Sequence, residues 1–178
     1  FEKVIDSLLK EEAERAKHGQ FLKAEAEGQL ELKDIGFSLK GKADRFDLLD
    51  DQTLAIYDYK TGKPSGPEVR KSFDKQLPLT AAMAAEGAFK DIPATAIGRI
   101  GYIGLGSDCG EFLLKPEEYD TANILAEFRK LILAFLSPDK GYPSRRAVQK
   151  ESFSGDYDHL ARFGEWSSTD DPVKEVLT

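Results

Sequence analysis

The sequence GKADRFDLLDDQTLAIYDYKTGK, residues 41–63, predicts a β-hairpin on which the rest of the chain depends. Two β-type runs, residues 39–49 and 53–60, flank the polar residues 50–52. This pattern is typical of a hairpin with a three-residue connection. We therefore expect two antiparallel strands joined by a short polar turn.

A turn centred on Asp51 brings two carboxylates face to face at the other end of this hairpin. Asp44 then lies opposite Asp58, with the two Cβ atoms roughly 5 Å apart. Because side chains alternate along a strand, Lys60 projects from the same face as Asp58, and Tyr59 projects from the other face. The hairpin is thus expected to gather two carboxylates and one ammonium group.

Nearer the turn, the same face of the hairpin is apolar. The predicted register sets Phe46 opposite Ile56 and Leu48 opposite Leu54. Such a patch is suited to packing under a helix. The charged end of the hairpin therefore begins where a hydrophobic core is expected to end.

Opposed carboxylates point to a bound cation. Like charges that face each other across two strands destabilise the sheet, and partial burial increases the cost. Mg²⁺, which prefers oxygen ligands, would compensate Asp44 and Asp58. An alternative is that both acids are solvated and that Asp58 pairs only with Lys60. A slip of one residue in register would also separate the two acids.

The composition indicates one soluble globular domain. The chain has 178 residues, of which 40% are hydrophobic and 32% are charged. No apolar run approaches the ~20 residues that span a bilayer, and no signal-peptide pattern is present. Cys109 is the single cysteine, which excludes an internal disulfide and any site with several cysteine ligands. We expect a cytoplasmic protein without an iron-sulfur cluster.

The net charge of −7 argues against nucleic-acid binding through bulk electrostatics alone. A partner that carries phosphate would need a local basic path, a metal ion or another subunit. The chain starts at Phe1 without a methionine, and we expect it to be part of a longer protein.

Helical and β-type patterns alternate along the rest of the chain. Pro78 is expected to start or kink the long part of the second helix, because proline lacks a backbone N–H. The expected domain organisation is a core over residues 1–137 with a tail over residues 138–178 that packs on it. The expected helices are residues 1–17, 69–88 and 119–136, and the expected further strands are residues 21–32, 96–105 and 111–114.

A basic cluster precedes Pro78, close to the loop that leaves the acidic end of the hairpin. Arg70, Lys71, Lys75 and Gln76 make up this cluster. It could touch phosphates, although basic clusters are more often solvated surface. Other candidates for metal binding are weaker: His18 lies beside a helix end, and Glu25 and Glu27 share one face of a strand.

Three segments together resemble the PD-(D/E)XK nuclease superfamily, and more narrowly its RecB-like branch. They are GKADRFD at residues 41–47, IYDYKTGK at residues 56–63 and QLPL at residues 76–79. The similarity extends from about Ala24 to Trp166 and is greatest to the C-terminal nuclease domains of alphaproteobacterial AddB subunits, which act in AddAB helicase-nucleases. The resemblance implies an α/β fold, a restriction-endonuclease-like core with a mixed central β-sheet flanked by helices.

The resemblance also implies roles for individual residues. Asp44 and Asp58 match the acidic metal ligands, with the carbonyl of Tyr59 as a third ligand. Lys60 matches the catalytic lysine, and Gln76 matches the glutamine found in this branch. The implied cofactor is Mg²⁺, with Mn²⁺ as a substitute. The implied partners are DNA, contacted by the basic cluster, and the helicase subunit AddA.

The chain departs from the RecB-like pattern in three respects. The usual N-terminal histidine, in a Gly-x-x-x-His pattern, is missing, and Thr80 stands where a tyrosine is common. The four cysteines that bind an iron-sulfur cluster in many AddB proteins are also missing.

Three functions are therefore compared. The first is an Mg²⁺-dependent DNA exonuclease that acts in recombinational repair of double-strand breaks. The second is an inactive nuclease-like module that binds DNA or a helicase subunit. The third, a hydrolase of a small phosphorylated metabolite, has no residue in its favour.

Overall fold

The computed structural model describes residues 2–107 and 109–141, together with residues 158–160, 162, 164–166, 170, 171 and 173. The chain divides into two compact units, Phe1–Phe128 and Arg129–Thr178, with the boundary inside helix α4 (Thr121–Leu136). The expected packing of residues 138–178 on the core falls mostly outside the described residues and stays a prediction. The following description concerns the first unit.

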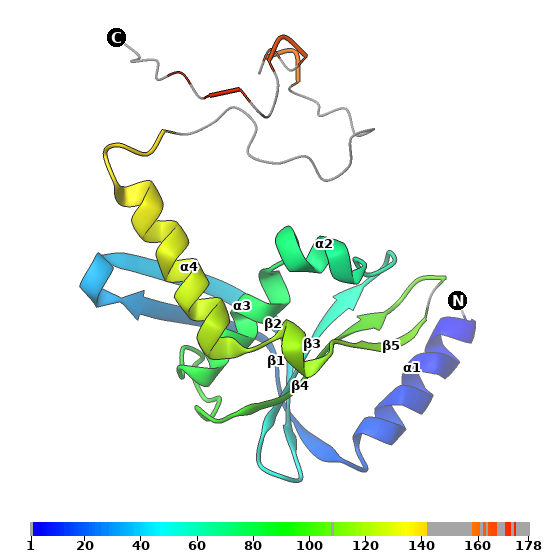
Figure 1. Ribbon diagram of the computed structural model, residues 1–178. Coiled ribbons are helices and arrows are strands. Elements are labelled where there is room, and N and C mark those ends of the chain that lie inside the picture. The colour runs from blue at the N-terminus through cyan, green and yellow to red at the C-terminus, as the bar shows by residue number, and fades with distance from the viewer. Residues whose placement is uncertain are drawn as a thin grey trace. The chain divides into compact units, whose positions relative to one another are not determined.

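A five-stranded sheet forms the centre of this unit, with its strands in sequence order (Figure 1). The pairs β1–β2, β2–β3 and β4–β5 are antiparallel, whereas β3 and β4 are parallel. Parallel strands need a crossover connection, which here contains two helices. The strands are β1 (Gly19–Leu32), β2 (Phe37–Leu49), β3 (Leu54–Lys60), β4 (Ile97–Gly104) and β5 (Gly110–Leu113).

The crossover differs from the single helix expected over residues 69–88. It contains α2 (Pro67–Ser72) and α3 (Gln76–Ala85), so the expectation of one helix was wrong. Pro78 is the third residue of α3, where an N–H has no partner within the helix. Proline therefore fits the first turn of α3, and the break over residues 73–75 comes just before it. The other elements are α1 (Glu2–Arg15) and the short 3-10 helices Lys33–Ile35 and Pro116–Glu118.

Helix α3 covers one face of the sheet. Its buried residues Leu77, Ala81 and Met83 pack with side chains from the strands beneath. Phe46 belongs to the same core and meets Phe89 edge to face, with ring centroids 5.0 Å apart. The prediction that the apolar patch of the hairpin packs under a helix is thus confirmed. The strand residues of this core include Leu54, Ile56, Ile100 and Tyr102, all of which are fully buried.

Helix α1 packs on the opposite face of the sheet. Leu8 of α1 contacts a smaller core formed by Ala55, Tyr57 and Ile103. Tyr59 packs against this second core, which confirms that it points away from Asp58 and Lys60. Alternation along β3 therefore divides its side chains between the two helical layers.

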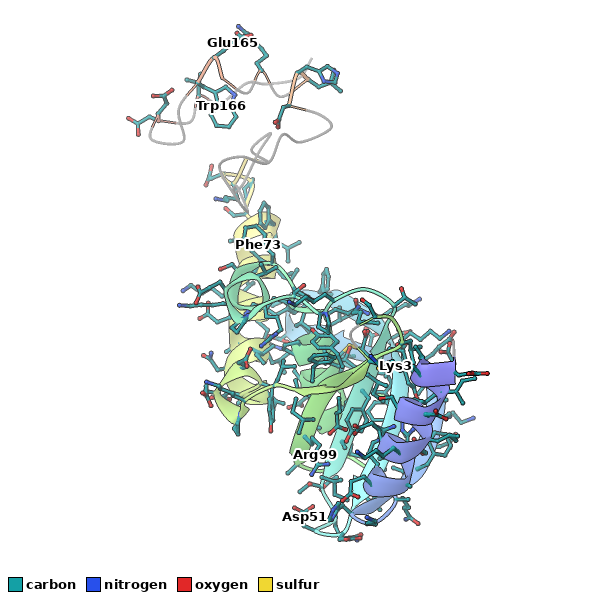
Figure 2. All side chains as sticks on the ribbon, turned by 90° about the vertical axis from the view of Figure 1, so that its right-hand side faces the viewer. Lys3, Asp51, Phe73, Arg99, Glu165 and Trp166 are labelled. Carbon is teal, nitrogen blue, oxygen red and sulfur yellow. The ribbon has the colours of Figure 1, made fainter. Side chains whose placement is uncertain are left out.

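The mixed sheet between helical layers confirms the expected α/β class. In the part of the chain that the structure describes, no helix is long and apolar enough to cross a membrane. Figure 2 places Asp51 at the tip of the β2–β3 turn and Phe73 at the opposite end of the unit. The acidic end of the hairpin lies away from that turn, toward the break between α2 and α3.

Candidate active site

The β2–β3 hairpin has the register that its sequence predicts. Its ladder runs from Leu48 opposite Leu54 to Arg45 opposite Tyr57. Next to that pair, the Asp44 side chain binds the neighbouring strand: its Oδ2 accepts a hydrogen bond from the backbone N–H of Tyr59 at 2.9 Å. The carboxylate of Asp44 is therefore fixed against the strand that carries Asp58.

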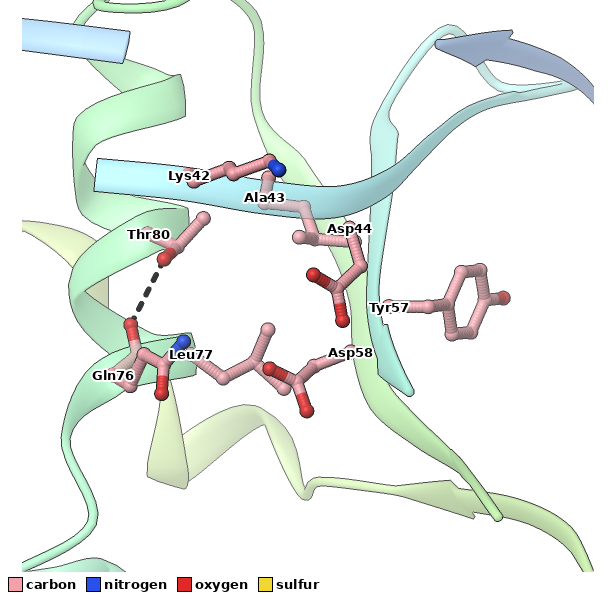
Figure 3. Close-up of a pocket in the computed structure, with 9 residues that line it drawn as sticks. Lys42, Ala43, Asp44, Tyr57, Asp58, Gln76, Leu77 and Thr80 are labelled. Atoms are coloured by element: carbon pink, nitrogen blue, oxygen red, sulfur yellow. Dashed lines mark hydrogen bonds between the residues drawn. The ribbon is translucent and has the colours of Figure 1, made fainter. Parts of the chain in front are cut away.

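Asp44 and Asp58 line one pocket, and Figure 3 shows both carboxylates pointing into it. Gln76, the first residue of α3, lines the pocket from the other side. Three predicted site residues from β2, β3 and α3 are thus brought together. The remaining lining residues are Lys42, Ala43, Ile56, Tyr57, Leu77 and Thr80.

Asp58 is the most buried charged group of the pocket, with only 9% of its surface exposed. Lys60 Nζ lies 2.9 Å from Asp58 Oδ2, but this ion pair lacks hydrogen-bond geometry, and Oδ2 has no hydrogen-bond partner. Burial raises the pKa of Asp58; the nearby Lys60 opposes this rise, and the negative charges of Asp44 and Asp74 add to it. The negative charge at Asp58 is therefore only partly compensated by the protein.

The second strand changes its alternation at Asp44. Ala43 and Phe46 are three residues apart, and strict alternation would place them on opposite faces, yet both belong to the core under α3. Glu25 of β1, which the register places beside Asp44, has a left-handed backbone with φ of 52°. Few residues other than glycine adopt this conformation, which costs roughly 1–2 kcal/mol. The irregular pairing allows β2 to keep Asp44 at the pocket while Ala43 stays buried.

Gln76 is positioned by the first turn of α3. Its backbone carbonyl accepts a hydrogen bond from Thr80 Oγ1 at 3.0 Å (Figure 3). Thr80 is buried and lines the pocket. Thr80 therefore braces the helix turn that carries Gln76.

The basic cluster divides into one paired and two exposed cations. Arg70 Nη2 lies 2.8 Å from Glu118 Oε1, and Arg70 also donates to the carbonyl of Ser65. Lys71 and Lys75 are exposed. Of the three residues predicted to contact DNA, Arg70 thus already holds α2 in place, whereas both lysines present their ammonium groups to solvent.

The sequence analysis missed three residues next to the site. Lys42 lines the pocket and pairs with Glu25. Asp74 adds negative charge near Asp58, and the ring of Tyr102 lies under Lys60. Lys42 lies two residues before Asp44, and Asp74 lies two residues before Gln76. This spacing could have suggested both residues. Nothing in the sequence indicated Tyr102, because its position depends on the parallel pairing of β3 with β4.

The residues of the pocket fit a divalent cation. A buried carboxylate oxygen without a hydrogen-bond partner shares the pocket with a second carboxylate, and oxygen ligands of this kind suit Mg²⁺ and Mn²⁺. Within the described residues, no group of three or more His, Cys, Asp or Glu side chains could hold a metal ion. His18, an alternative ligand in sequence, pairs instead with Glu14 at 3.5 Å. Among the described residues, the side chains that could hold the ion in this pocket are thus Asp44 and Asp58.

The fold and the acidic pocket define a class of protein: an α/β enzyme fold with paired carboxylates and a lysine at the end of a hairpin. The family model of the PD-(D/E)XK nuclease superfamily matches residues 1–151. The chain belongs to this superfamily, whose members are nucleases that usually use divalent metals. No curated protein matches the chain.

Proposed function

We propose that this chain is the Mg²⁺-dependent DNA exonuclease domain of a helicase-nuclease that acts in recombinational repair of double-strand breaks. The observation that carries this proposal is the pairing of Asp44 with the partly uncompensated Asp58, beside Lys60 and Gln76. The segments that resemble the RecB-like branch support assignment to that branch, with AddB as the nearest type and AddA as the partner subunit.

Each residue has a distinct role in this proposal. Asp44 and Asp58 would hold the cation, with the Tyr59 carbonyl as a further ligand. A bound Mg²⁺ or Mn²⁺ lowers the pKa of coordinated water and neutralises charge on the phosphate. Lys60 orients the attacking water or stabilises the charge that develops on the phosphate oxygens.

Gln76 and the exposed lysines position the substrate. Gln76 presents an amide at the start of α3, from where it can hydrogen-bond the water or the scissile phosphate. Lys71 and Lys75 contact the DNA backbone, as positive side chains do without reading sequence. Arg70 contributes by fixing α2 through Glu118 and can reach phosphate only if that pair opens.

A cleavage assay with matched variants tests the proposal. The intact protein with its helicase partner is incubated with Mg²⁺ and either single-stranded or duplex DNA. Asp58→Ala and Lys60→Ala are each expected to reduce the cleavage rate roughly 10²–10⁴-fold, because each removes charge placed at the reacting phosphate. The control is Asp50→Asn, which removes an acid of the exposed turn and should leave the rate unchanged. Cleavage by Asp58→Ala at the parental rate would contradict the proposal.

The alternative is a nuclease-like module that binds DNA or a helicase subunit without cutting. The net charge of −7 and the presence of Thr80 in place of the common tyrosine favour it. Calorimetric titration with Mg²⁺ separates the two functions. A nuclease should bind the ion with heat that Asp44→Asn abolishes, whereas a binding module should show no such site.

A further inference from the structure

Lys60 has two neighbours at the pocket, and only one of them is a carboxylate. Its Nζ lies 2.9 Å from Asp58 Oδ2 and 5.7 Å from the centroid of the Tyr102 ring. A cation within about 6 Å of an aromatic centroid, over the face of the ring, is attracted to the π electrons. The ammonium group is therefore held between the carboxylate and the ring.

Tyr102 is rigidly placed for this contact. It lies on β4 directly beside Asp58 in the parallel pairing, and only 1% of its surface is exposed. Its hydroxyl points toward Asp74, with the two oxygens 3.5 Å apart. Burial, followed by the negative charges of Asp74 and Asp58, raises the pKa of Tyr102, so its hydroxyl keeps its proton.

The ring and the carboxylate differ in what they do when a cation binds at the pocket. Asp58 cannot give the same oxygen to Lys60 and to a metal ion, so a metal competes with the lysine for it. The ring of Tyr102 does not compete for the metal ion, so its face continues to attract the ammonium group. A lysine supported by the ring can thus stay in the site after its carboxylate has been taken.

We propose that Tyr102 is a positioning residue for Lys60: its ring retains the ammonium group at the pocket, and its hydroxyl links this arrangement through Asp74 to the segment that precedes Gln76. The proposal rests on the proposed nuclease function for its catalytic consequence. The placement of Lys60 over the ring does not depend on that function. The two parts can therefore be tested separately.

The activity test varies the electron density of the ring while keeping its shape. Position 102 is changed to Phe and then to phenylalanines with one, two and three ring fluorines. We expect Tyr102→Phe to stay within about threefold of the parent, and kcat to fall stepwise with fluorination, reaching about tenfold, because each fluorine weakens the attraction of the ring for a cation. KM for DNA should change less than twofold.

The control for this series is the same set of fluorinated residues at Phe46. Phe46 is a fully buried ring in the same core, and it packs edge to face on Phe89. Fluorination there should leave kcat unchanged. If kcat were equal across the series at position 102, or if both positions responded alike, the positioning role would be overturned.

The second readout is the proton spectrum of the Lys60 ε-methylene in metal-free protein without DNA. A ring beneath the side chain moves these signals upfield. We expect the upfield position in the parent and in Tyr102→Phe and its loss in Tyr102→Leu. An unshifted signal in the parent would overturn the placement. Upfield signals in a parent that cannot cut DNA would instead contradict the nuclease function and leave the placement of Lys60 over the ring intact.

Discussion

Two sets of buried charges, one on each face of the sheet, are compensated to different degrees. On the face under α3, Asp58 is buried with an oxygen that lacks a hydrogen-bond partner, and its pKa is raised. On the face under α1, the buried Asp47 accepts hydrogen bonds from Arg45 at 2.7 and 3.0 Å. Arg45 also donates to both carboxylate oxygens of Glu12, at 2.6 and 2.8 Å.

This difference separates a charge cluster that is satisfied within the protein from one that is not. Burial of Arg45 alone would lower its pKa, but the hydrogen bonds with Glu12 and Asp47 reverse the effect and raise it. Bidentate pairs of this kind satisfy both partners. Asp44 and Asp58 have no comparable arginine among their described contacts. The carboxylate of Asp47 is therefore satisfied within the protein, whereas that of Asp58 is only partly compensated.

The largest expected effect comes from breaking the cluster under α1. Arg45→Met should destabilise the protein by about 3–5 kcal/mol, because it leaves the carboxylate of Asp47 buried without its cation. Asp47 has 6% of its side chain exposed, so water cannot replace the lost partner. Urea unfolding followed by circular dichroism measures the change.

A matched control for that variant is Lys42→Met. Lys42 also pairs with a carboxylate, that of Glu25, but their side chains are 53% and 62% exposed. An exposed ion pair contributes little to stability, because solvent screens it. Equal losses from Arg45→Met and Lys42→Met would mean that burial does not distinguish the two clusters.

A smaller effect of opposite sign is expected at the pocket. The folded-state pKa of Asp58 is raised above the value of 3.8. The contribution of Asp58 to stability is therefore fully present below that pH and is lost as the pH rises through the folded-state pKa. Asp58→Asn mimics the protonated acid and should stabilise the metal-free protein at neutral pH.

Thermal unfolding from pH 3 to pH 8 measures this difference. The gain from Asp58→Asn should shrink as the pH approaches 3.8 from above. Addition of Mg²⁺ should stabilise the parent and leave the variant unchanged, since a ligand stabilises only the state that binds it. If the variant were less stable than the parent at neutral pH, the charge of Asp58 would be compensated to the same degree as that of Asp47.

The smallest expected effect concerns Glu12, at the edge of the cluster under α1. Its hydrogen bond with Arg45 is the main reason that its pKa is lowered to about 2 from 4.5, and burial opposes this change. Its stabilising contribution is therefore present above pH 4.5 and is lost as the pH falls through about 2. Because 44% of its side chain is exposed, solvent screening keeps this contribution below about 1 kcal/mol.

Glu12→Gln should accordingly lower the melting temperature slightly at neutral pH, and the difference from the parent should vanish as the pH falls below about 2. Asp6→Asn, at an exposed position of the same helix, is the control and should match the parent at both pH values. A constant difference for Glu12→Gln across the whole range would show that the loss is one of packing and not of charge.

Much of the pocket could be predicted from local sequence. The hairpin register follows from the turn around Asp51, and this register puts Asp44 and Asp58 near each other. Alternation along one strand also separates Lys60 from Tyr59. These predictions succeed because short-range geometry decides them.

Other features could not be predicted, because contacts distant in sequence decide them. The left-handed backbone of Glu25 and the changed alternation at Asp44 depend on pairing between β1 and β2. The helix expected over residues 69–88 is divided in the structure. The hydrophobic pattern does not reveal the division, because its period continues across the break before α3. The sequence does not show that Arg70 is paired, because its partner Glu118 lies 48 residues away in the chain.

The sequence by itself determined the hairpin, its acidic end and the resemblance to nucleases, since these depend on residue spacing of a few positions. Only the tertiary structure decided which charges are compensated. Arg45 meets Glu12 of a distant helix, whereas Asp58 meets Lys60, two residues along the chain, and Tyr102 of a parallel strand. Arg45 thereby joins Asp47 to a second element, and whether such a partner reaches a buried charge is a property of the folded chain.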